Sequence, residues 1–245
     1  MLTAAGMANA YADEPQAVTG YVAMSSNYVG RGLAQSVGEP SLLAELNYID
    51  GDGFYAGVSA ASINWIDQLY PGNSVSIEVD GWLGYRRSFA DDWLFKGGVL
   101  RLQFPGHYAP QDPPVARPDT TELFASIGWR MVSAKLNYAV TDSFGTPDSR
   151  GSWYFDVSAS LPLGTDWSAG AHIGRKQGRG RHPITGVSHG QSSYTDYKVS
   201  LTRYFPKALS VDLAYARTNA NPSLYTLNDY NVAGNHVWMM LQKSF

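Results

Sequence analysis

Few residues in this sequence stand at spacings that support covalent chemistry. Ser188 and His189 are adjacent, but they lie in a glycine-rich segment. No H-E-x-x-H or phosphate-binding loop motif occurs. His172 and His236 stand on separate alternating segments, and a zinc site needs three or four ligands. We therefore predict no enzyme activity, no catalytic residue, no cofactor and no metal site.

Charged residues instead recur within alternating segments, where they share the polar face. Acids and bases on the polar face of a closed sheet would line its interior, and two interpretations remain open. The charges form an ion-pair network that fills a narrow barrel, or they line a narrow pore. The predicted lining residues are Glu45, Glu78, Asp80, Arg86, Arg101, Glu122, Arg130, Lys135, Asp156, Asp196, Lys198 and Asp212.

One segment, 174–196, carries the largest group of like charges. It contains Arg175, Lys176, Arg179 and Arg181, and no acid follows until Asp196. Such a segment is either an electropositive patch at the mouth of a barrel or a solvated loop. A patch of this kind would attract anions or pair with lipopolysaccharide phosphates.

Period-two alternation of apolar and polar residues runs through most of the chain, which is typical of strands with two differently solvated faces. In one segment Leu123, Ala125 and Ile127 alternate with polar or small residues. About twelve such strands are predicted, an even count. They lie near residues 16–29, 41–49, 54–63, 74–87, 93–103, 120–130, 132–141, 153–161, 167–174, 195–203, 209–217 and 235–245.

The connections between these strands alternate between short and long. Tight turns such as DGDG, FADD, PLGTD and YFPKA separate the strands of every second pair, and long segments such as FPGHYAPQDPPVARPD separate the others. A soluble sandwich has no reason to sort its loops in this way. A meander through a bilayer does, because outer-membrane barrels have short periplasmic turns and long extracellular loops.

The composition agrees with this prediction. The chain has 245 residues with 16 Tyr, 25 Gly, no Cys and only 16% charged residues. No stretch approaches the roughly 18 apolar residues of a membrane helix. A net charge of −3 gives no overall basic excess, so nucleic acid is not an expected partner.

Both ends of the sequence carry signals. Residues 1–12 end in Ala10-Tyr11-Ala12, which resembles a cleavage site, so we interpret them as a truncated signal-peptide remnant preceding a single barrel domain over 13–245. The final strand runs to Phe245, which we expect to close the barrel in lipid. Aromatic residues should form a girdle at each membrane interface. On the short-turn side these are Trp93, Trp129, Trp167 and Phe205, and on the long-loop side Trp65, Phe104, Phe144 and Trp153.

The sequence also resembles the TorF-type porin family of proteobacterial outer-membrane proteins. The resemblance rests on SSNYVGRGLAQSVGEPSLLAELNY (25–48), GFYAGVSAASINW (53–65), SYTDYKVSLTRYF (193–205) and the terminal LQKSF. In the family's S-D-Y-x-F-R-G pattern, Asn27 replaces the acid and Gly30 the Phe. The resemblance implies an outer-membrane barrel and a C-terminal strand read by the assembly machinery.

We therefore expect an all-β, transmembrane, antiparallel up-and-down barrel in the outer membrane of a Gram-negative bacterium. Its expected function is a narrow channel for passive diffusion of small hydrophilic solutes or ions, in contact with outer-membrane lipid and lipopolysaccharide. The first alternative is a non-conducting structural or surface-binding barrel. The second is a lipid-modifying enzyme, which would need a nucleophile and a base within hydrogen-bond reach.

Overall fold

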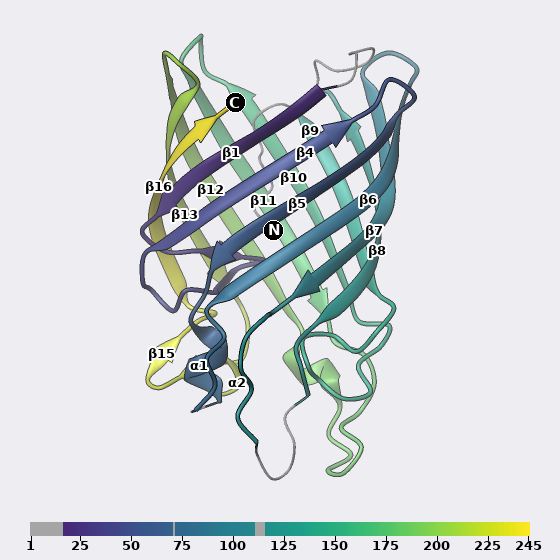
Figure 1. Cartoon of the computed structure of the whole chain (residues 1–245), viewed down its shortest axis with the longest axis vertical. Coiled ribbons are helices and arrows are strands. Elements are labelled where there is room, and N and C mark those ends of the chain that lie inside the picture. The colour runs from purple at the N-terminus through teal and green to yellow at the C-terminus, as the bar shows by residue number, and fades with distance from the viewer. Residues whose placement is uncertain (1–16, 71, 111–115) are drawn as a thin grey trace.

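The computed structural model describes residues 17–70, 72–110 and 116–245, and these form one closed antiparallel barrel (Figure 1). The predicted signal-peptide remnant, residues 1–12, lies outside the described residues. The barrel strands are β1 (Ala17–Ser25), β4 (Ser41–Ile49), β5 (Phe54–Ser62), β6 (Ile77–Phe89), β7 (Trp93–Gln103), β8 (Thr120–Trp129), β9 (Val132–Ala139), β10 (Trp153–Pro162), β11 (Trp167–Gln177), β12 (Tyr194–Phe205), β13 (Leu209–Thr218) and β16 (Asn235–Ser244).

Each strand pairs with its neighbours in the chain, and β1 pairs with β16 to close the barrel. Short turns connect one end and long loops the other, as the alternating connection lengths predicted (Figure 1). The number and order of the strands are therefore confirmed. Among the described residues, no helix has the length and apolar character needed to cross a membrane.

The long loops carry small elements of their own. They are β2 (Val29–Gly30), β3 (Leu33–Ala34), α1 (Trp65–Leu69), the 3-10 helix η1 (His189–Ser192), α2 (Pro222–Tyr225), β14 (Thr226–Leu227) and β15 (Tyr230–Asn231).

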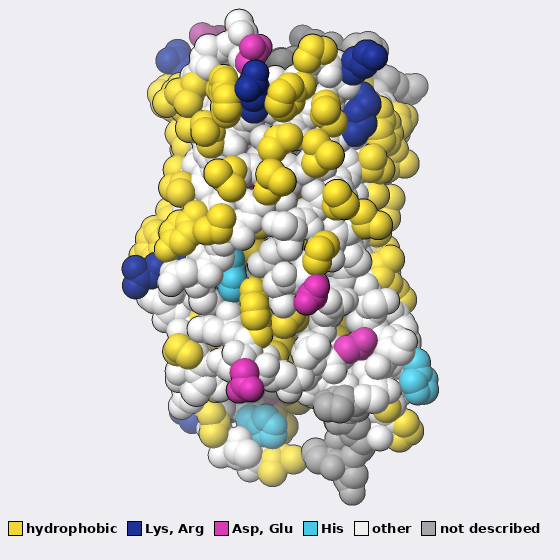
Figure 2. All heavy atoms as spheres, turned by 90° about the vertical axis from the view of Figure 1, so that its left-hand side faces the viewer, with side chains coloured by type: hydrophobic (Ala, Val, Ile, Leu, Met, Phe, Trp, Pro, Cys, Tyr) yellow, Lys and Arg dark blue, Asp and Glu magenta, His cyan; other side chains and the backbone are white. Residues whose placement is uncertain are grey.

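The outer surface of the barrel is apolar. Val237 of β16 and Phe245, which follows that strand, are each 65% exposed, whereas His236 and Trp238 on either side of Val237 are buried. Hydrophobic side chains gather over the upper and middle part of the face in Figure 2, with Lys and Arg at its top edge. A sheet that turns its apolar residues outward and its charged residues inward has the reverse of a soluble barrel's pattern.

Aromatic side chains form a rim at the short-turn end, as predicted. Trp93 contacts Trp129 with ring centroids 6.2 Å apart, and Arg203 lies over the Trp167 and Phe205 rings. Lys243 reaches the same end, where its Nζ donates to the Lys207 carbonyl oxygen.

The predicted girdle at the long-loop end is wrong for three of its four residues. Phe104 is fully buried, and it contacts Trp65 and Phe144 with ring centroids 5.6 and 6.2 Å away. These rings pack with Ile63 and Ile66 in an apolar core. The long loops thus supply a folded interior that alternation within strands does not reveal.

Candidate functional site

A small hairpin from the first long loop enters the barrel. Strands β2 and β3 pair antiparallel, and Arg31 and Gly32 connect them with φ of 50° and 77°. Two consecutive left-handed residues are what a tight hairpin turn requires. A Cβ at Gly32 would lie 2.5 Å from Asp196 Cβ and 2.7 Å from Thr218 Cγ2. Only glycine lets the tip of this hairpin contact β12 and β13.

Arg31 extends from this tip to another part of the wall. Its Nη1 and Nη2 donate to Glu122 Oε1 and Oε2 at 2.8 and 2.6 Å, which is a bidentate ion pair. The Arg31 Cζ lies 4.9 Å from the centre of the Tyr154 ring, and the Tyr194 hydroxyl donates to the Arg31 carbonyl oxygen at 2.8 Å. The hairpin and its arginine therefore link β8 to β10 and β12 through the interior.

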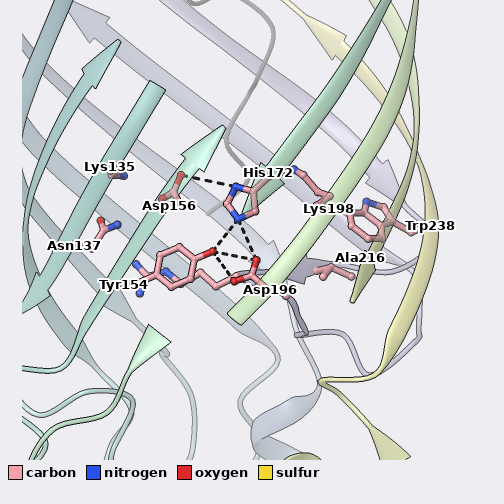
Figure 3. Close-up of a pocket in the computed structure, with 12 residues that line it drawn as sticks. Lys135, Asn137, Tyr154, Asp156, His172, Asp196, Lys198, Ala216 and Trp238 are labelled. Atoms are coloured by element: carbon pink, nitrogen blue, oxygen red, sulfur yellow. Dashed lines mark hydrogen bonds and ion pairs between the residues drawn. The ribbon is translucent and has the colours of Figure 1, made fainter. Parts of the chain in front are cut away.

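A second polar cluster lines the cavity beside Arg31 (Figure 3). The Tyr154 hydroxyl donates to Asp196 Oδ2 at 3.0 Å, and His172 Nε2 lies 3.0 Å from Asp196 Oδ1. On the other side of the imidazole, Nδ1 lies 2.9 Å from Ser158 Oγ and 3.8 Å from Asp156 Oδ1. Lys135 and Lys198 complete the charged lining of the cavity.

Ser158, His172 and Asp196 have the side-chain types of a hydrolytic triad. The surrounding backbone does not fit, because β9, β10 and β11 are paired through Ser133, Ser158 and His172. Backbone amides engaged in the sheet are not available to hold an oxyanion. The cluster is better suited to ordering charges along the wall.

Apolar packing supports the hairpin from both sides. Val29 and Ala34 pack with Ala214, Ala216 and Trp238 of the barrel wall. Tyr28 lies on the opposite side, in the core with Leu100 and Phe104. Burial and the nearby carboxylates of Glu78 and Asp80 raise the pKa of Tyr28. Its phenol therefore stays neutral.

Loop residues also pack against each other above the bore. The hydroxyl of Tyr225 in α2 donates to the Ser192 carbonyl oxygen at 2.6 Å, and its ring meets Tyr194 edge-on. Burial raises the pKa of Tyr225, which keeps its hydroxyl protonated as a donor. The long-loop end is thus a packed structure.

Most of the predicted lining residues lie on inward-facing positions of the strands. This set includes five buried carboxylates, at Glu78, Asp80, Glu122, Asp156 and Asp196. The others on inward positions are Glu45, Arg86, Lys135, Lys198 and Asp212.

Two predicted lining residues lie elsewhere. Arg101 shares the outward face of β7 with Val99, and its Nη1 donates to Thr121 Oγ1 at 2.9 Å. Buried Leu100 and Leu102 occupy the inward positions beside it. Arg130 is a turn residue with φ of 48°, and its Nε donates to Asp92 Oδ2 at 2.8 Å with the side chain 60% exposed. Both arginines therefore belong to the barrel's edges.

The four predicted residues of the basic loop do not form one patch. β11 continues to Gln177, so Arg175 and Lys176 are strand residues on opposite faces. Arg175 donates to Thr195 Oγ1, whereas Lys176 Nζ lies inside, 5.8 Å from the Tyr194 ring centre. Only Arg179 and Arg181 are exposed loop residues. The prediction was wrong because alternation in β11 extends beyond its apolar part.

Sequence reasoning missed two interior bases. Lys96 alternates with Phe95 and so falls on the inward face of β7, a signal that was present. Arg31 lies in a loop, where periodicity carries no information about its direction. The sequence feature that could have indicated this hairpin is the Arg31-Gly32 pair, which suits a tight hairpin turn.

The chain belongs to the family described as "Bacterial protein of unknown function (Gcw_chp)", which matches residues 9–245. No curated protein matches the sequence. The fold is similar to solved structures of outer-membrane channels, at identities too low to carry more than the fold.

Three of these structures cover nearly the whole barrel. A KdgM porin has a TM-score of 0.56 at 11% identity and covers 94% of this chain and 99% of its own. A NanC porin has a TM-score of 0.56 at 10% sequence identity, and the match covers 93% of this chain and 98% of the porin. An outer membrane channel from Pseudomonas putida F1 has a TM-score of 0.55 at 14% sequence identity, and the match covers 98% of both chains.

Proposed function

We propose that this protein is an outer-membrane channel of the TorF type, for passive diffusion of small hydrophilic solutes or ions. The observation that carries the proposal is the reversed barrel, with Val237 and Leu213 exposed outside and Asp80 and Asp196 buried inside. Charged side chains are stable inside such a barrel when water or counter-charges accompany them. The likeness to porins of known structure supports the same function.

The apolar exterior suits outer-membrane lipid, with the long loops facing outward and in contact with lipopolysaccharide. The short turns, with Arg130, Lys207 and Lys243 at their rim, would face the periplasm. Assembly machinery would recognise the final strand, β16 with Phe245. Insertion in this direction follows the general asymmetry of outer-membrane barrels.

The proposed selecting region of this channel is the level of Arg31. The hairpin tip, the Arg31–Glu122 ion pair and the cluster of Tyr154, His172 and Asp196 meet there. A solute passing the cavity would contact groups of both signs at short range, where interactions between charges are stronger than in bulk water. Exclusion by size, adjusted by these charges, is the proposed mechanism of selection.

A non-conducting barrel is the second candidate, and a specific observation favours it. The hairpin is anchored on both sides of the bore, through Tyr28 and through Val29. A plug of this kind could serve structure or surface binding alone.

Conductance of the purified protein in planar bilayers separates the two candidates. A channel is expected to produce discrete current steps in KCl that scale with salt concentration. Uptake of small sugars into proteoliposomes, with larger sugars excluded, would extend the result to uncharged solutes. Correctly folded protein, recognised by heat-modifiable migration in gels, that gives no current and no uptake would replace the channel with the structural barrel.

A further inference from the structure

Three bases and one serine lie in a single row across four neighbouring strands of the inner wall, which we call the basic row. Arg86 of β6 pairs directly with Lys96 of β7, Lys96 pairs with Ser126 of β8, and Ser126 pairs with Lys135 of β9. All four are inward positions on their strands. Neighbouring strands lie about 4.8 Å apart, so this basic row extends over about 14 Å.

Two members of the basic row have no acid to neutralise them. Among the described residues, the side chains of Arg86 and Lys96 make no ion pair or hydrogen bond, although ion pairs such as Arg31–Glu122 and Arg130–Asp92 form elsewhere. Like charges directly opposite each other on a sheet are destabilising. The repulsion between Arg86 and Lys96 therefore destabilises this part of the barrel wall.

The inward positions next to these two bases contain no carboxylate. They are occupied by Gly84 and Gly98, which pair with each other, and by the aromatic rings of Tyr55 and Phe124. The nearest acid along β8 is Glu122, which is already held by Arg31.

Other charged groups face the row from further away. Asp156 pairs in register with Lys135, at the end of the row beside the cavity. On the opposite side of the barrel, Asp212 of β13 accepts a hydrogen bond from Thr202 at 2.6 Å. The region around Arg86 and Lys96 is therefore locally positive within a bore of mixed charge.

We propose that Arg86, Lys96 and Ser126 form a binding site for an oxyanion group, a carboxylate or a phosphate on a small organic solute. A guanidinium offers a planar fork for two oxygens, an ammonium adds a third donor, and the serine hydroxyl a fourth. Lys135 connects this site to the cavity below the hairpin. This inference rests on the proposed channel and names the class of solute that it selects.

The test uses the purified full chain and two anionic probes, succinate and inorganic phosphate. The variant is Arg86→Gln/Lys96→Gln, and the matched control is Arg87→Gln, which removes a base from the exposed face of the same strand. Heat-modifiable migration first verifies that each protein is folded. Calorimetric titration in detergent then measures binding, and bilayer recordings in KCl measure block of the current by each probe.

We expect the double variant to bind the preferred probe at least about tenfold more weakly, because it loses two charge-assisted hydrogen bonds. The control should bind as the natural protein does. Stronger binding of succinate identifies a carboxylate site and stronger binding of phosphate a phosphate site. Binding of neither probe, or equal binding by the natural protein and the folded double variant, overturns the site.

The two readouts separate this inference from the channel itself. If the protein conducts and the folded double variant still binds the anion fully, the channel is supported and the anion site is wrong. If anion binding depends on Arg86 and Lys96 but the protein does not conduct, the anion site is supported and the channel is wrong.

Discussion

Gly20 and Phe245 exchange both of their backbone hydrogen bonds, each at 3.0 Å, where the first and last strands of the barrel meet. The Phe245 ring lies over Gly20, so that a Cβ there would stand 2.7 Å from a ring carbon and 2.4 Å from the Glu45 carbonyl oxygen. An open sheet edge in hydrocarbon leaves backbone groups unpaired at several kcal/mol each. This pair therefore contributes directly to closure.

Gly20→Ala should destabilise the barrel by about 1–3 kcal/mol, since the new methyl group overlaps backbone as well as a ring. Gly81→Ala is the matched control, because no atom lies within 4 Å of a Cβ at that strand position. Urea unfolding in lipid vesicles measures both. Equal stability of the two variants would mean that the seam between β1 and β16 is looser than its geometry indicates.

Deletion of Phe245 removes both hydrogen bonds to Gly20. We expect a lower yield of assembled barrel, measured as the heat-modifiable fraction in outer-membrane preparations. Phe245→Ala keeps the backbone pair and should assemble better than the deletion. A normal yield from the deletion would contradict a role for this residue in closure or in recognition by the assembly machinery.

Opposite faces of β5 should respond differently to arginine. Val58→Arg places a charge on the apolar exterior, where Val58 is 45% exposed, and should cost about 2–4 kcal/mol if the site lies near mid-bilayer. Ser59→Arg places the same charge inside, between Glu45 and Asp80 in register, and should cost much less. Urea unfolding in vesicles compares them. A larger loss at Ser59 would indicate an apolar interior.

The barrel itself could be predicted because its determinants are local. Alternation within each strand reports which side chains face lipid, and connection lengths report which end a turn occupies. Leu123 and Ile127 were thus placed outside and Glu122 inside from sequence alone, as their exposures confirm. Strand ends could not be predicted in the same way, since β11 continues through Arg175 and Lys176 where its apolar pattern has ended.

The constriction could not be predicted because its contacts join residues far apart in the chain. Arg31 meets Glu122 across a separation of 91 residues, and Tyr194 meets Arg31 across 163. Phe104 and Trp65 were expected at a lipid interface, since an aromatic residue at a strand end suits either a girdle or a core. Only the path of the loops distinguishes these two environments.

Removal of Arg31 should widen the channel. Arg31→Ala is expected to raise single-channel conductance, because the side chain that crosses to Glu122 is gone. It should also cost about 3–5 kcal/mol of stability, since Glu122 is left as an unpaired charge that is only 4% exposed. Arg31→Ala/Glu122→Ala should recover much of that loss and keep the higher conductance. Unchanged conductance in both folded variants would place the constriction elsewhere.

Selectivity should depend on Lys176 more than on the arginines of the loop that follows it. Lys176 faces the interior with its Nζ 5.8 and 5.9 Å from the Tyr194 and Tyr225 ring centres. Arg179 and Arg181 are exposed to bulk water, where their fields are screened within about 8 Å at physiological salt. A charge inside the bore acts on a passing ion at shorter range and in a lower effective dielectric.

Lys176→Gln should therefore lower the anion-to-cation permeability ratio by roughly twofold or more, a shift visible in the reversal potential across a KCl gradient. Arg179→Gln/Arg181→Gln removes twice the charge and serves as the control, with a smaller shift expected because both groups are screened. If the loop double variant shifts the reversal potential more than Lys176→Gln does, the loop enters the path of the ions. The charges that select solutes would then lie at the mouth, and the inner wall would act chiefly through its width.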